Sequence, residues 1–154
     1  MARHSFTEQG GITGRVRIVT RDLRTGHLID DSGWSANTVT NGYLAALAGA
    51  SLGQPMSPAT QTELGTGTGT PAVTDTSLFT PDSATILTCS SLTLPASPIN
   101  TAQWVSVYTG PAGAFTEVGL LAKDGTLYAH KMATVTITSG TQTTVTWQIT
   151  LSAG

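Results

Sequence analysis

The chain has 154 residues and a net charge of -2, and only 10% of its residues are charged, against about 25% in an average soluble protein. Its 29 threonines and 13 serines supply most of its polar side chains. This composition excludes charge-driven disorder and a long charged helix or coiled coil. Nucleic-acid binding is disfavoured, because a pI of 5.8 leaves no basic surplus to neutralise phosphates. The composition indicates an all-β chain that hides surface in an assembly.

The beginning of the chain divides into an arm and a first hairpin. Residues 1–12 are polar and without alternation, so we expect an N-terminal arm there and a single β-sandwich domain over residues 13–154. Arginines alternate with apolar side chains over residues 15–20, which predicts a half-buried strand. Gly26 has the position of a turn residue with positive φ, and a second strand is predicted through residues 27–30.

One helix is predicted, over residues 41–51, with Thr40 or Asn41 as its N-cap. Residues 52–82 are predicted to be mostly loop, apart from a short strand near 61–66. Within this loop, glycine occupies alternate positions, which allows other backbone to approach closely.

The second half of the chain predicts further strands. The clearest signal is a hairpin around Asp124-Gly125, and threonines occupy the alternate, outward positions of the last strand. The predicted strands cover residues 84–94, 102–108, 115–123, 126–133, 134–138 and 144–151. About eight strands at this spacing indicate an antiparallel sandwich or barrel with one short helix.

Positive charge is gathered at the start of the chain. Residues 1–24 sum to +3, whereas residues 25–122 hold six acids and no lysine or arginine. The two parts could attract each other within one chain or between copies, or the arginines could simply form the solvated face of the first strand. As candidate partner-binding residues we take the five arginines, namely Arg3, Arg15, Arg17, Arg21 and Arg24.

Motifs for catalysis, cofactors or metals are absent from the sequence. The glycine-threonine run has no lysine, so it does not fit a phosphate loop. His4, His27 and His130 lack metal-ligand spacing, and no Gly-x-Ser-x-Gly elbow occurs. Glu117 is the most suggestive acid, and we expect it to meet a backbone amide or an arginine in a structural role. Cys89 is expected to be a buried, inert thiol. We therefore expect a non-enzymatic protein without cofactor or metal.

Targeting signals are also lacking. The first residues contain no apolar core of a signal peptide, and the longest apolar run is too short to cross a bilayer. We expect a soluble chain made in the host cytoplasm, with neither membrane nor nucleic acid as a partner.

Three segments, read together, resemble a group of small structural proteins of tailed bacteriophages. They begin at Asn37, Glu63 and Glu117, and their order and spacing extend over residues 35–151. The first leads into the short helix, the second contains the glycine-threonine run and the third contains the Asp124-Gly125 hairpin and the closing strand. The resemblance implies a component of the virion without a catalytic site, on either the head or the tail.

From charge and resemblance together we expect a capsid decoration or cement protein. It would bind the major capsid protein and stabilise the head shell, as a homo-oligomer with a trimer as its natural form. Deleting residues 1–12 should then abolish particle binding and leave the fold intact. A tail or baseplate adaptor that attaches a fibre is the alternative within virions, and a small carbohydrate-binding β-sandwich is the alternative outside them.

Overall fold

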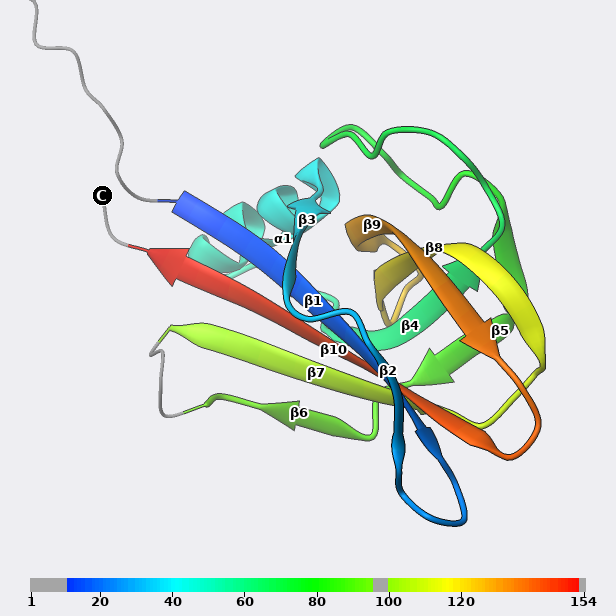
Figure 1. Cartoon of the computed structure of the whole chain (residues 1–154). Helices are drawn as coiled ribbons and strands as arrows, with labels where there is room; N and C mark the ends of the chain where they lie inside the picture. Colours follow the sequence, from blue (N-terminus) through cyan, green and yellow to red (C-terminus); the bar gives the residue numbers. More distant parts are fainter. Residues whose placement is uncertain (1–10, 96–99, 153–154) are drawn as a thin grey trace, which may run out of the picture.

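The computed structural model describes residues 11–95 and 100–152, and shows an all-β domain with one short helix (Figure 1). In chain order the elements are β1 (Gly11–Asp22), β2 (Leu28–Asp31), β3 (Ser35–Val39), α1 (Asn41–Ser51), β4 (Ala59–Gly65), β5 (Pro81–Thr88), β6 (Ser91–Thr93), β7 (Thr101–Tyr108), β8 (Gly113–Ala122), β9 (Leu127–Ile137) and β10 (Thr141–Ser152). The predicted helix is confirmed, and the described residues form ten strands where about eight were expected.

The strands form one antiparallel path that curls into a half-barrel (Figure 1). Their order is β5-β4-β8-β9-β3-β1-β10-β7-β6, and β2 pairs with β1 off this path. The short strand β3 links the two halves, because it pairs with β1 on one side and with β9 on the other. The chain therefore closes most of its sheet around one core and leaves the β1–β2 hairpin outside it.

The core lies on the concave side of the curled sheet. Trp147 on β10 is fully buried and pairs in register with Trp104 on β7. The indole of Trp104 donates to the carbonyl of Ala59 on β4 at 2.9 Å, and thus ties the two halves together. Alternation along β10 had predicted its apolar face, and the structure confirms that Val145, Trp147 and Ile149 are buried.

Several threonines do not face outward as the sequence had suggested. The predicted outward positions hold for Thr144, Thr146 and Thr150 on β10, but Thr62, Thr85 and Thr143 are buried. Thr62 stays inside because its hydroxyl is satisfied: Oγ1 lies 2.8 Å from Ser106 Oγ and 3.1 Å from the Trp147 indole nitrogen. A buried hydroxyl with partners costs far less than an orphaned one.

Helix α1 packs on the core through Tyr43, with Ala46 and Leu47 partly buried beside it. Tyr43 is its one buried residue within the described chain, and its ring meets that of Tyr128 edge-on at 5.2 Å. Thr40 is the N-cap residue, but its hydroxyl donates to the carbonyl of Leu127 on β9 and makes no cap bond. The expected cap side chain therefore fastens the helix to the sheet.

Several boundaries differ from the expectations: residues 35–39 form the unpredicted strand β3, and the strands expected over residues 126–133 and 134–138 are the single strand β9. The single strand expected over residues 84–94 is two strands, because the chain passes from the partner of β4 to the partner of β7 between Thr88 and Ser91. The expected arm over residues 1–12 falls outside the described residues except for Gly11 and Ile12, which begin β1 and pair with β10.

Candidate functional site

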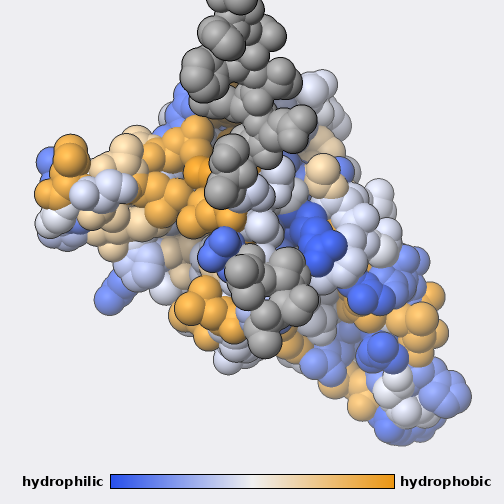
Figure 2. Space-filling model, turned by 90° about the vertical axis from the view of Figure 1, so that its left-hand side faces the viewer, coloured by the Kyte–Doolittle hydropathy of each residue, from blue (hydrophilic) through white to orange (hydrophobic). Residues whose placement is uncertain are grey.

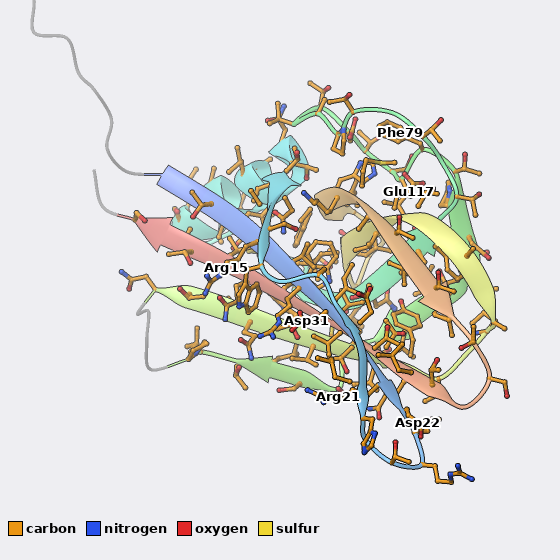
Figure 3. All side chains as sticks on the ribbon, in the orientation of Figure 1. Arg15, Arg21, Asp22, Asp31, Phe79 and Glu117 are labelled. Atoms are coloured by element: carbon orange, nitrogen blue, oxygen red, sulfur yellow. The ribbon has the colours of Figure 1, made fainter. Side chains whose placement is uncertain are left out.

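The arginines of the first strand share the outer face of the sheet. Val16 and Ile18 are buried in the core, so Arg15 and Arg17 point the other way, as the alternation predicted. Figure 3 shows Arg15 and Arg21 spaced along β1 toward the hairpin. Arg24 is exposed in the turn after β1, and Arg3 lies outside the described residues.

Arg17 is neutralised within the chain. Its Nε donates to Asp31 Oδ1 at 3.0 Å, and its Nη2 contacts Asp31 Oδ2. The hydrogen bond from Arg17 is the main cause that lowers the pKa of Asp31 to about 2. Attraction between the basic start and the acidic middle therefore operates inside one copy at this pair.

The β1–β2 hairpin, residues 19–31, projects from the body of the domain (Figure 1). Asp22 Oδ1 accepts from the backbone amides of Arg24 and Thr25 at 2.9 and 2.8 Å, which lowers the pKa of Asp22 and fixes the turn. Gly26 has φ of 72°, so the predicted turn glycine is confirmed. All four residues of β2 are exposed, so this strand adds nothing to the core.

Large apolar side chains are exposed on this hairpin. Leu23, Leu28 and Ile29 are 49%, 54% and 56% exposed. In Figure 2 the projection at the lower right, which corresponds to this hairpin, mixes hydrophobic and strongly hydrophilic residues. Apolar groups rimmed by charge are typical of a surface that another protein covers.

Arg15 is held in a different environment from the other arginines. Its guanidinium carbon lies 4.4 Å from the centre of the Trp34 ring, and its Nε donates to Gln148 at 2.8 Å. Gln148 in turn donates to Gln103 at 2.7 Å, so a row of side chains crosses three strands on the outer face. In the described part of the chain no carboxylate pairs with Arg15.

A second group of polar side chains is buried between β8, β9 and the loop that precedes β5. His130 Nδ1 lies 2.8 Å from Asp75 Oδ2, and His130 Nε2 lies 3.0 Å from Glu117 Oε2. The side chains of His130 and Glu117 are fully buried, while that of Asp75 is 14% exposed. We name Asp75, Glu117 and His130 the buried triad.

Backbone amides also donate to both carboxyl groups of the triad. Glu117 accepts from the backbone amides of Phe79 and Thr80 at 3.0 and 2.8 Å, and Asp75 accepts from that of Ala72 at 2.9 Å. The triad is therefore tied to the backbone of the loop that precedes β5. The expected contact of Glu117 with a backbone amide is confirmed.

The glycine-threonine run fits against this triad. A Cβ added to Gly65 would lie 2.6 Å from the carbonyl oxygen of Thr80, and one added to Gly67 would lie 2.7 Å from its amide nitrogen. Phe79 packs on His130 with the ring centres 4.8 Å apart. The glycines thus allow close backbone approach, as expected, and let residues 66–80 lie against Glu117 and His130. Figure 3 shows Phe79 of this segment near Glu117.

The remaining candidates from the sequence stay apart. His27 is exposed in the hairpin, and Cys89 is partly buried, where burial raises the pKa of its thiol. Residues 11–95 and 100–152 contain neither a cluster suited to a metal ion nor a helix long and apolar enough to cross a membrane. Comparison of the chain with protein-family models, curated proteins and solved structures finds no match.

Proposed function

We propose that this chain is a non-enzymatic structural protein of a bacteriophage particle, which decorates the head shell and stabilises it. The observation that carries the proposal is the β1–β2 hairpin, which leaves the domain body and exposes Leu28 and Ile29 beside charged residues. Exposed leucine and isoleucine on a projecting strand are expected where a partner covers them. The resemblance to small structural proteins of tailed bacteriophages supports a phage particle as the assembly that the chain joins.

The geometry also suggests how the contact would form. Arg21 and Arg24 flank the apolar residues of the hairpin and are exposed. They would orient the hairpin toward an acidic patch on the major capsid protein, while burial of the apolar residues would supply affinity. Arg3 and the rest of the expected arm would extend this contact.

A particle-binding experiment tests the proposal. Empty shells of the phage that encodes the chain would be incubated with the purified protein and sedimented. The double variant Leu28→Ser, Ile29→Ser should no longer sediment with the shells. Leu52→Ser is the matched control, because Leu52 is 82% exposed on the helix end and lies outside the hairpin. Full binding by the double variant would refute the hairpin contact.

Imaging of the labelled protein on intact particles distinguishes the two sites on the virion. Label spread over the head supports decoration of the shell. Label confined to the tail or baseplate would replace the head proposal with that of an adaptor for a fibre.

A further inference from the structure

A hollow of about 330 Å³ lies on the outer face beside Arg15. It is lined by Thr13, Gly14, Arg15, Trp34, Ser35, Ala36 and Thr150. None of the apolar residues of the hairpin borders it, and the proposed contact with the shell does not use it. We propose that this hollow binds a sugar acid, meaning a pyranose ring that carries a carboxylate.

The carboxylate would be recognised by Arg15. Its Nε is occupied by Gln148, so the end formed by Nη1 and Nη2 has no acceptor among the described residues. Two parallel N–H groups at that end match the two oxygens of a carboxylate. In the described part of the chain, Arg17 has an acid partner and Arg15 has none. An external carboxylate would complete this site.

The guanidinium is also positioned before any ligand arrives. Trp34 supports its face and Gln148 fixes its Nε, and Gln148 is itself held by Gln103. A free arginine side chain loses rotamer entropy when it is fixed, so prior fixing favours binding. Side chains locked in this way by a second row of residues are typical of binding sites.

The rest of the lining suits a sugar better than a protein side chain. Trp34 is 37% exposed although the Arg15 guanidinium lies over its ring, whereas Trp104 and Trp147 are buried, so the exposed part of the Trp34 indole can contact the C–H groups of a pyranose. Thr13, Ser35 and Thr150 add hydroxyl groups around it. A protein partner would need an apolar centre to its contact, and among the described residues Trp34 is the one exposed large apolar side chain that lines the hollow.

The test is a titration monitored by NMR of the tryptophan indole N–H signals, with the Trp34 signal assigned through Trp34→Phe. Sodium glucuronate is the probe, glucose is its neutral counterpart, and acetate supplies a carboxylate without a ring. Glucuronate should shift the Trp34 signal saturably, acetate should do so only weakly, and glucose should leave it unchanged. Equal responses to glucuronate and glucose, or no response at all, would overturn the proposal.

Variants connect the response to Arg15. Arg15→Gln should abolish it, and Arg15→Lys should weaken binding about tenfold, because lysine lacks the planar fork. Arg17→Gln is the matched control and should bind like the wild type. Binding retained in Arg15→Gln, or a triglutamate peptide that binds more tightly than glucuronate, would exclude the sugar-acid site. The hairpin variant Leu28→Ser, Ile29→Ser should bind glucuronate normally. Failure of the sugar-acid proposal can therefore be distinguished from failure of the shell-binding proposal.

Discussion

The β1–β2 hairpin and the loop of residues 66–80 both leave the sheet, but they are stabilised in opposite ways. The loop lies on two fully buried side chains, Glu117 and His130. Glu117 accepts hydrogen bonds from two backbone amides of the loop, and the ring of His130 packs on that of Phe79. The hairpin is fixed by the exposed carboxylates of Asp22 and Asp31. The loop is thus part of the folded core, whereas the hairpin is a surface held in shape but left uncovered.

Removal of the Glu117 carboxylate should have the largest effect on stability. In Glu117→Ala the backbone amides of Phe79 and Thr80 lose their acceptor, and the Nε2 atom of His130 loses its hydrogen-bond partner. Breaking a buried charged contact on one side costs about 3–5 kcal/mol. Urea denaturation followed by circular dichroism should show a loss of this size.

The matched control for this change is Asp124→Asn, at the exposed turn between β8 and β9. Asp124 accepts only from a local backbone amide, that of Thr126 at 2.9 Å. Its stability should change by no more than about 0.5 kcal/mol, as at most surface positions. A comparable, small loss in both variants would mean that the loop does not depend on the triad.

A methyl group at Gly67 should be the next most damaging change to the loop. In Gly67→Ala the new Cβ meets the Thr80 backbone at 2.7 Å, and the backbone cannot yield as a flexible side chain would. Overpacking of this kind costs about 1–3 kcal/mol. Thermal unfolding should therefore occur at a lower temperature than in the wild type.

Gly49→Ala in α1 is the matched control for Gly67→Ala, because it adds the same methyl group at a site with more room. There the added Cβ would meet mainly Gln54 Oε1, the end of a flexible side chain, at 3.0 Å. Replacing a helical glycine by alanine stabilises by about 0.5–1 kcal/mol. The two glycine variants should thus move the unfolding temperature in opposite directions, and a shift in the same direction would contradict the close approach at Gly67.

The contrast also explains how much the sequence predicts. Alternation predicts the buried faces of β1 and β10, and helical spacing of apolar residues predicts the helix over 41–51, since each pattern depends on residues close in the chain. The buried triad was missed because Asp75, Glu117 and His130 come from three separate segments, and only the folded sheet brings them together. The alternating glycines of the glycine-threonine run were the one feature of the sequence that indicated close packing at this place. Likewise, the pairing of Arg15 with Trp34 depends on β3 crossing beside β1.

On the hairpin, replacement of exposed apolar residues should hardly affect the fold. Leu28→Ser with Ile29→Ser removes side chains that are more than half exposed and contribute nothing to the core. The free energy of unfolding should stay within about 0.5 kcal/mol of the wild-type value. A larger loss in urea denaturation would show that the hairpin packs on the body, and would weaken its assignment as an uncovered contact surface.

The smallest effect is expected from the ion pair at the base of the hairpin. Arg17 lowers the pKa of Asp31 to about 2 in the folded protein, below the value of about 3.9 in an unfolded chain. A depressed pKa contributes stability above the unfolded value, and this contribution is lost as the pH falls toward 2. The unfolding temperatures of the wild type and Asp31→Asn should therefore differ slightly at pH 7 and converge by about pH 2. Because the pair is exposed, added salt should shrink the difference at pH 7. A difference that persisted at low pH would show that Asp31 holds the turn by its shape, through the Gly33 amide that it accepts at 2.9 Å, and that its charge is not required.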